Sequence, residues 1–344
     1  MTLTSSDGKP TLAAIARVTG VSTPTVSKVV NGREDVSAET RAKVLAALDE
    51  AGYQSPGQRR SPGQPSVVEV AFDGVNSNYS ATVLDGILTY AASIGVEVVL
   101  SVTGSEHPGG PGLGRRAQRL IDEGRAGIIL VTSAFSDSHL AAFRRRRIPV
   151  VVIDPLNPPP KDVVSVGATN WAGGKAAAEH LLGLGHRRIA YLGGPESAEC
   201  NQARLHGYLS ALMSAGIDVD PELISHGKFR VEHGIDGLTR LLSLSERPTA
   251  IFAGSDSIAV GVLREARRRG LHVPEELSLV GFDGTALAED SVPSLTSVSQ
   301  PLHDMGRTAL RTLLRQARGE QLDSHRVELA TQLVVRESTA PPPL

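Results

Sequence analysis

Residues 11–51 read TLAAIARVTGVSTPTVSKVVNGREDVSAETRAKVLAALDEA, and this stretch decides how the rest of the chain is interpreted. Its apolar residues recur at helical spacing in three short segments. Gly20 follows the first segment, at a place where a Cβ would resist a sharp turn. Ser22 is typical of a helix N-cap, and Pro24 fits the first turn of the next helix. The pattern predicts three helices, the first two separated by a tight turn.

The second predicted helix has two chemically different sides. Its inner side is formed by valines, at Val26, Val29 and Val30. Its outer side carries small hydroxyl groups and one cation, at Thr23, Thr25, Ser27 and Lys28. Side chains of this kind approach phosphates and base edges, so the layout predicts a helix-turn-helix unit whose second helix enters the major groove. The alternative is a three-helix bundle that binds no nucleic acid, which would have no need for Ser-Thr-Pro-Thr-Val-Ser at this position.

A known family shares these residues. The run AAIARVTGVSTPTVSKVVNG, continued by VSAETRAKVLAALDEAGY, closely resembles the headpiece of the lactose-repressor (LacI) family of bacterial transcription regulators. The resemblance implies a sequence-specific repressor that binds a near-palindromic operator as a homodimer, or as a larger assembly of dimers. It also implies that Thr23, Pro24 and Lys28 read bases, with Lys28 recognising guanine. The other residues expected at the DNA are Thr11, Ser22, Thr25, Ser27 and Asn31.

The composition fits a basic head on an acidic body. The whole chain has a formal charge of −2, but residues 1–65 hold eight Lys and Arg against six Asp and Glu. This concentrates phosphate affinity at one end of the chain. Cys200 is the only cysteine, which excludes an internal disulfide and fits a reducing compartment. Since the N-terminus lacks a signal-peptide pattern and no stretch resembles a membrane span, we expect a cytoplasmic protein.

A linker separates residues 1–52, the headpiece, from a core at residues 66–344. Residues 53–65 include QSPGQRRSPGQP, whose prolines and glycines oppose helix formation. In the LacI family a hinge helix here inserts a leucine into the minor groove, and Pro62 falls at about that leucine's place. Either the hinge is irregular, which we favour, or Pro62 itself acts as the wedge.

The core alternates short apolar runs with helical segments. Four runs, VVEVAF, EVVLSV, GIILV and PVVVID, begin near residues 67, 97, 127 and 149. A second set follows near residues 163, 188, 249 and 277: VVSVG, RIAYLGG, TAIFAG and LSLVGFD. Such runs are typical of buried parallel strands joined by helices. The prediction is an α/β core of two Rossmann-like subdomains, with a ligand cleft at the carboxyl ends of the strands.

The family resemblance adds connectivity that periodicity does not provide. It implies a core similar to periplasmic sugar-binding proteins, in which the chain crosses between lobes more than once. We expect one lobe from residues 66–166 and 297–325, and the other from residues 167–296 and 326–340. A final strand near residues 327–335 should complete the second lobe, and the tail STAPPPL is expected to be disordered.

Polar residues after the apolar runs are candidates for binding a small sugar-like effector. Asp283 follows LSLV, and Ser255 and Asp256 follow TAIFA; a carboxylate there accepts two hydroxyl hydrogens at once. Asp256 fits the capping of the following helix equally well. Arg204 lies in a segment similar to the family's Arg-x-x-Gly-aromatic motif. The other candidates are two aromatic residues expected in loops, Phe229 and Trp171, an adjacent amide, Asn170, and three residues suggested by the resemblance, Asp73, Tyr79 and Gln300.

Other functions have less support in the sequence. No nucleophile elbow is present and the ten histidines lack metal-ligand spacing, so we expect no enzyme, no metal and no cofactor. A purely ligand-binding protein of the periplasmic type would not need the headpiece. Whether the effector is an inducer or a corepressor, such as a nucleobase, stays open.

Overall fold

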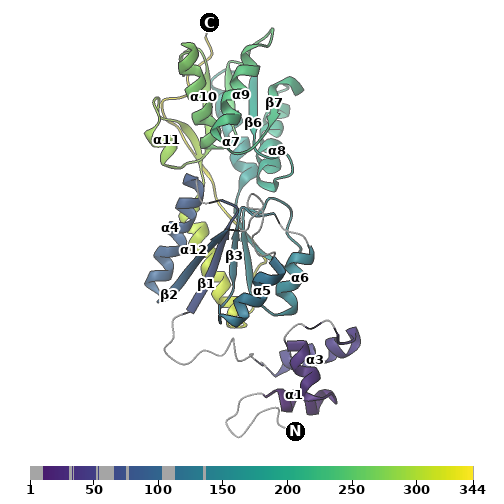
Figure 1. Cartoon of the computed structure of the whole chain (residues 1–344). Coiled ribbons are helices and arrows are strands. Elements are labelled where there is room, and N and C mark those ends of the chain that lie inside the picture. The colour runs from purple at the N-terminus through teal and green to yellow at the C-terminus, as the bar shows by residue number, and fades with distance from the viewer. Residues whose placement is uncertain are drawn as a thin grey trace.

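The computed structural model describes residues 11–30, 33, 35–51, 53, 66–74, 77–102, 113–134 and 137–343, except for the side chains of 113–114 and 137–139. These residues form a small helical headpiece, a first lobe and a second lobe, which follow one another in space (Figure 1). Two expected DNA contacts, Asn31 and Pro62, lie outside the described residues, as does most of the linker. No helix in the described ranges is both long enough and apolar enough to cross a membrane.

The headpiece contains the three predicted helices, α1 (Leu12–Thr19), α2 (Thr23–Val30) and α3 (Ala38–Glu50). Gly20 ends α1 in the left-handed conformation, with φ at 67°. The Ser22 hydroxyl accepts a hydrogen bond from the Thr25 amide at 3.2 Å, which confirms the predicted N-cap. The inner faces meet in a small core that includes Ile15, Val26, Val29, Val44 and Leu48.

The first lobe is a parallel six-stranded sheet in the order β11-β5-β4-β3-β1-β2. Its strands are β1 (Ser66–Phe72), β2 (Val96–Val102), β3 (Ile128–Val131), β4 (Val150–Ile153), β5 (Val164–Ala168) and β11 (Arg326–Leu329). One face packs against α4 (Asn78–Ser93) and α12 (Leu302–Ala317). The other face packs against α5 (Leu113–Asp122) and α6 (Asp137–Arg145).

The second lobe repeats this plan with the strand order β12-β10-β9-β8-β6-β7, in which only β12 is antiparallel to its neighbour. Its strands are β6 (Ile189–Gly193), β7 (Ile224–His226), β8 (Ala250–Ala253), β9 (Ser278–Asp283), β10 (Thr296–Ser299) and β12 (Gln332–Val334). Helices α7 (Asn170–Gly183) and α8 (Glu199–Ser214) cover one face. Helices α9 (Val231–Leu242), α10 (Asp256–Arg269) and α11 (Ala286–Asp290) cover the other.

The connectivity corrects three expectations. The VVSVG run, grouped by sequence with the second set, forms β5 in the first sheet. The final strand does not belong to the second lobe alone, because β11 pairs with β5 and only β12 joins the second sheet. The tail is partly ordered, since Ser338 and Ala340 hydrogen-bond to residues at the start of β9. Apolar periodicity identifies a strand but not the strand that it pairs with, so the sequence pattern does not predict these pairings.

Paired glycines bring neighbouring helices into backbone contact. A Cβ on Gly174 of α7 would lie 2.2 Å from the carbonyl oxygen of Arg204 in α8. Reciprocally, a Cβ on Gly207 of α8 would lie 2.1 Å from the carbonyl oxygen of Trp171 in α7. The same arrangement joins α4 to α12 and α9 to α10, through the pairs Gly86 with Gly306 and Gly234 with Gly261.

We predict that Gly174→Ala destabilises the chain by about 1–3 kcal/mol, because the added methyl meets a backbone atom that moves only if α7 and α8 separate. Gly183→Ala in the same helix is the control, since a Cβ there has no neighbour within 4 Å. Its stability should stay the same or rise by up to about 1 kcal/mol. Chemical unfolding of both variants tests this, and equal stability in the two would contradict the packing argument.

Candidate functional site

A cavity of about 430 Å³ lies between the two lobes. It opens where parallel strands of both sheets end, which is the expected position for a ligand in such folds. Six of the ten residues proposed from the sequence line it: Asp73, Tyr79, Arg204, Phe229, Ser255 and Asp283. Two cations that flank Phe229 also line it and were not anticipated, Lys228 and Arg230.

Arg204 is the buried cation of this cleft, with only 2% of its surface exposed. Its Nε donates to the Asn170 side-chain oxygen at 2.7 Å, and its Nη1 donates to the Gly254 carbonyl at 2.6 Å. The guanidinium carbon lies 3.8 Å from the centroid of the Phe282 ring, where the π face attracts a cation. Among the described residues Nη2 has no hydrogen-bond partner, so Arg204 can still offer donors to a ligand.

Asp283 ends β9 beside this arginine. One of its carboxylate oxygens lies 3.5 Å from Nη1 of Arg204 and accepts a hydrogen bond from the Gln300 amide at 2.8 Å. Burial raises the pKa of Asp283 to about 8, although the positive charge of Arg204 acts in the opposite direction. The carboxyl group therefore changes protonation near neutral pH, and can donate as well as accept hydrogen bonds.

Asp154 is a cleft residue that the sequence reasoning missed. It follows β4, and its carboxylate accepts a hydrogen bond from the Tyr79 hydroxyl at 2.7 Å. Burial raises the pKa of Asp154, while Arg204 and the bond from Tyr79 lower it. The sequence pattern that identifies Asp283, a polar residue at the end of an apolar run, also applies to Asp154, which ends the run PVVVID.

Three non-glycine residues at strand ends adopt left-handed backbone conformations in the cleft wall. Thr132, Asp154 and Asp283 have φ values of 45°, 40° and 111°. Such conformations cost of order 1–3 kcal/mol each and concentrate at ligand-binding sites. Here they turn polar side chains out of the strands and into the space between the lobes.

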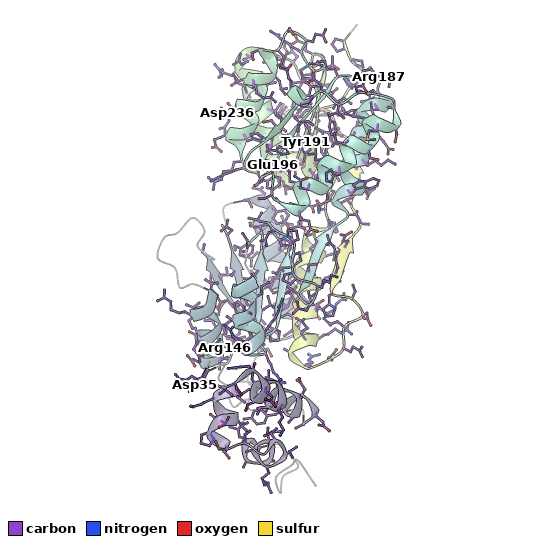
Figure 2. The ribbon with its side chains drawn as sticks, turned by 90° about the vertical axis from the view of Figure 1, so that its right-hand side faces the viewer. Asp35, Arg146, Arg187, Tyr191, Glu196 and Asp236 are labelled. Atoms are coloured by element: carbon purple, nitrogen blue, oxygen red, sulfur yellow. The ribbon has the colours of Figure 1, made fainter. Side chains whose placement is uncertain are left out.

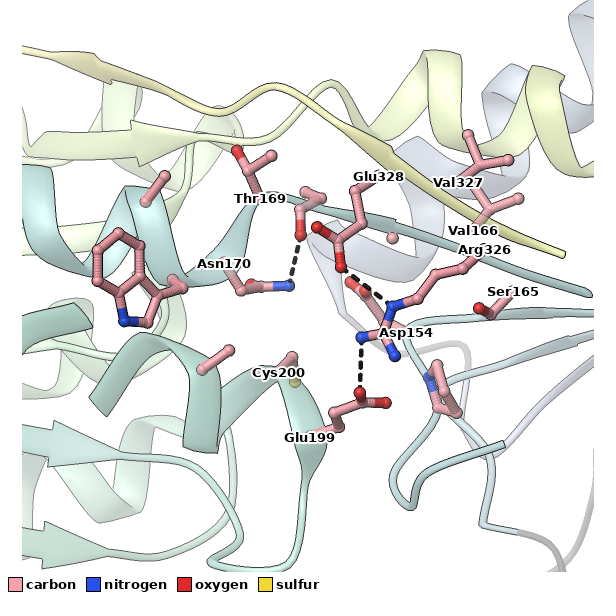
Figure 3. A pocket seen from close by; sticks show the side chains of 16 residues that line it. Asp154, Ser165, Val166, Thr169, Asn170, Glu199, Cys200, Arg326, Val327 and Glu328 are labelled. Carbon is pink, nitrogen blue, oxygen red and sulfur yellow. Dashed lines mark hydrogen bonds and ion pairs between the residues drawn. The ribbon is translucent and has the colours of Figure 1, made fainter. Parts of the chain in front are cut away.

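A second, smaller cavity of about 240 Å³ lies behind the cleft and holds two of the proposed residues, Asn170 and Trp171 (Figure 3). Asn170 supports Arg204 from this side. Trp171 is 47% exposed and belongs to the first turn of α7, so the expectation that it lies in a loop was wrong. Figure 3 also shows Arg326 between Glu328 and Glu199, at 3.2 and 2.6 Å, the second of these contacts joining the two lobes.

Asp256 and Gln300 do not line the cleft. Both carboxylate oxygens of Asp256 are engaged, one by Ser297 at 2.6 Å and the other by the amide and hydroxyl groups of Thr285 at 2.7 and 2.9 Å. The helix-capping alternative is also not realised, because Ser255 caps α10 instead. The geometry favours a structural role for Asp256 and a supporting role for Gln300, which holds Asp283.

The cleft is chemically suited to binding polar molecules that also have an apolar face. It combines guanidinium donors, carboxyl groups and hydroxyl groups with the ring of Phe229. The Cys200 thiol also lines it, but burial raises its pKa to about 12, so it is not a thiolate nucleophile.

The outer side of α2 is the candidate DNA-reading surface. Thr23, Pro24 and Lys28 are exposed, whereas Val26 and Val29 are fully buried. Thr11 caps α1 by accepting from the Ala14 amide at 3.2 Å. The hydroxyl groups of Ser22 and Thr25 are hydrogen-bonded to each other at 2.8 Å. Thr23, Pro24 and Lys28 can therefore meet a groove without disturbing the headpiece fold.

Comparisons with known proteins agree with this architecture. The family model described as "Bacterial regulatory proteins, lacI family" matches residues 11–55, and the model described as "Periplasmic binding protein-like domain" matches residues 178–339. The HTH-type transcriptional regulator CelR of Thermobifida fusca is 33% identical over 340 residues, which cover 96% of this chain and 98% of CelR. The chain belongs to the lacI family of bacterial regulatory proteins.

Solved lacI-family structures share the whole architecture. A CelR–cellobiose complex is 32% identical and has a TM-score of 0.72, over 96% of this chain and 100% of that chain. A lac repressor dimer bound to operator and the anti-inducer ONPF is 27% identical, with a TM-score of 0.71 over 96% and 99% of the two chains. The present lacI-family chain is accordingly a DNA-binding transcriptional regulator.

The raised pKa of Asp283 predicts a pH-dependent stability difference. Between its unfolded pKa near 3.9 and its folded pKa of about 8, the folded state binds the proton more tightly, so this group's stabilising contribution is lost as the pH rises. We expect the melting temperature of Asp283→Asn, relative to that of the original chain, to increase by several degrees from pH 5 to pH 8.

The exposed residue Asp218 supplies the control, because Asp218→Asn changes a carboxylate that stays in water in both states. Thermal melts at four or more pH values measure the two differences. A constant difference for Asp283→Asn across this range would show that burial does not control its proton.

Proposed function

We propose that this regulator represses transcription by binding a near-palindromic operator, and that a small sugar or sugar-like effector in the interlobe cleft controls this binding. The observation that carries the proposal is a single cavity lined from both lobes, with Asp73, Tyr79 and Asp154 on one side and Arg204 and Asp283 on the other. Hydroxyl groups of a sugar match these donors and acceptors, and the ring of Phe229 suits its apolar face. The relative solved with cellobiose has the same two-lobed architecture.

Control by the effector requires different affinities for two arrangements of the lobes. A ligand that contacts Asp154 and Arg204 together would connect two lobes whose covalent connections are three crossing segments, which follow β5, β10 and β11. The ion pair between Arg326 and Glu199 also spans the lobes and depends on their arrangement. An inducer would favour the arrangement that misplaces the headpieces, and a corepressor the other.

Operator symmetry calls for two copies of the chain. The first lobe exposes large apolar side chains on α4, on the turn that ends it and on the edge strand β2: Leu88, Ile94, Leu100 and Val102, which are 41%, 42%, 48% and 37% exposed. An exposed apolar group on a sheet edge is a liability unless another chain covers it. We assign this face to the homodimer.

Thr23, Pro24 and Lys28 would read bases, while Thr11, Ser22, Thr25 and Ser27 would approach the phosphates. The protein would act in the cytoplasm, where the operator lies. Since relatives such as CelR are transcriptional regulators, we infer that the cleft binds its ligand without transforming it.

Replacing Arg204 tests the proposal. The ligand for this test is the sugar that raises the melting temperature most, chosen from a panel that includes cellobiose and ribose. Arg204→Ala should bind this sugar at least about 100-fold more weakly than the original chain, because two or more charge-assisted hydrogen bonds are lost. Arg204→Lys keeps the charge but not the planar fork and should lose most of the same affinity. Operator binding without sugar should persist in both variants.

The matched control is Arg264→Ala, which removes an exposed arginine from α10 of the same lobe. Calorimetric titration of folded variants supplies the affinities. Sugar binding by Arg204→Ala that equals that of Arg264→Ala would remove Arg204 from the effector site.

A further inference from the structure

Lys28, the candidate base-reading cation, forms an ion pair with a carboxylate of the same headpiece. Nζ of Lys28, in the last turn of α2, lies 2.6 Å from a carboxylate oxygen of Asp35 in the segment before α3. The two side chains are 49% and 56% exposed, so the pair stands on the surface of the headpiece. Asp35 is marked on the headpiece in Figure 2.

Neither fold stability nor phosphate affinity accounts for this pair. Exposed ion pairs contribute only about 0–1 kcal/mol to stability. A carboxylate beside the cation also opposes DNA binding, since the phosphate backbone is densely negative and attracts positive charge. Asp35 therefore weakens binding to every sequence, unless its oxygens gain a partner on the DNA.

The major groove offers such a partner. A lysine binds O6 and N7 of guanine, and a carboxylate accepts from the N4 amino group of cytosine. Within one G·C pair the guanine O6 and the cytosine N4 are hydrogen-bonded to each other, at about 2.9 Å. The separation between Lys28 Nζ and the Asp35 oxygen, 2.6 Å, matches the spacing of those two edge atoms.

We propose that Asp35 is a specificity-determining residue, and that it forms with Lys28 a donor and acceptor pair that selects one G·C base pair in each operator half-site. An A·T pair presents the reverse pattern in the groove, with a donor on adenine N6 and an acceptor on thymine O4. A reversed C·G pair exchanges the positions of the guanine acceptor and the cytosine donor, so that neither faces its partner side chain. Asp35 thus penalises the wrong base pairs, while Lys28 favours the right one. The proposal rests on α2 lying in the major groove.

The test is operator selection with the full-length chain. A library of randomised near-palindromic duplexes is bound at one fixed salt concentration by the original chain and by Asp35→Ala, Asp35→Asn and Lys28→Ala. Dissociation constants are then measured for the preferred duplex and for its single-base-pair substitutions. Glu39→Gln, which removes another exposed headpiece acid, is the control for net charge.

We expect the original chain to prefer G·C at one half-site position by about 5- to 100-fold. Asp35→Ala and Lys28→Ala should both lose the preference at that position and keep it elsewhere. Asp35→Asn should keep part of it, because the amide oxygen still accepts from cytosine. Glu39→Gln should change no preference.

Two outcomes would overturn the proposal. Equal strengthening of binding to all sequences by Asp35→Ala and Asp35→Asn, with every base preference intact, would make Asp35 a source of charge repulsion only. Loss of preference at different positions in Asp35→Ala and Lys28→Ala would show that the two residues do not act on one base pair. Thermal melts check that each variant is folded, and neither outcome affects the assignment of the chain as a DNA-binding regulator.

Discussion

The cleft between the lobes is built around the buried guanidinium of Arg204. A buried cation is tolerated only when hydrogen bonds and opposite charge replace its water. Asn170 and the Gly254 carbonyl supply those bonds, and Asp283 supplies charge. Asn170 comes from α7 and reaches the arginine because α7 and α8 pack closely through Gly174 and Gly207, whereas Gly254 and Asp283 reach it from the ends of β8 and β9. Helix packing and the strand ends together therefore hold Arg204 in place.

A second feature is common to both walls of the cleft. In both sheets the last polar residue of a strand is turned into the gap by a left-handed backbone, as at Thr132, Asp154 and Asp283. Because the chain crosses between the lobes after β5, β10 and β11, a ligand held between these walls acts on the same connections that relate the lobes. In the proposed mechanism, effector binding and the coupling between the lobes therefore involve the same crossing segments, whereas the headpiece is a separate DNA-binding unit.

Much of this was predictable from the sequence, because local rules govern it. Gly20 and Ser22 specify the turn and cap of the headpiece, and the apolar runs specify strands that bury both faces. Asp283 was identified because a polar residue ends such a run, and Asp154 was missed although the same rule applied to it. The pairing of β11 with β5, the supporting positions of Asn170 and Gln300, and the ion pair of Lys28 with Asp35 depend on contacts between distant elements, which no local pattern encodes.

Control of DNA binding by the cleft requires free-energy coupling between the cleft and the headpiece, and this coupling can be measured. Fluorescence anisotropy at fixed salt would give the operator dissociation constant without sugar and with a saturating concentration of the sugar that stabilises the protein most. We expect the operator dissociation constant to change by at least about fivefold, and sugar affinity to differ by the same factor between free and operator-bound protein, since linkage is reciprocal. A sugar that binds in the cleft and stabilises the fold, but leaves the operator dissociation constant unchanged, would show that the cleft does not control DNA binding through that sugar.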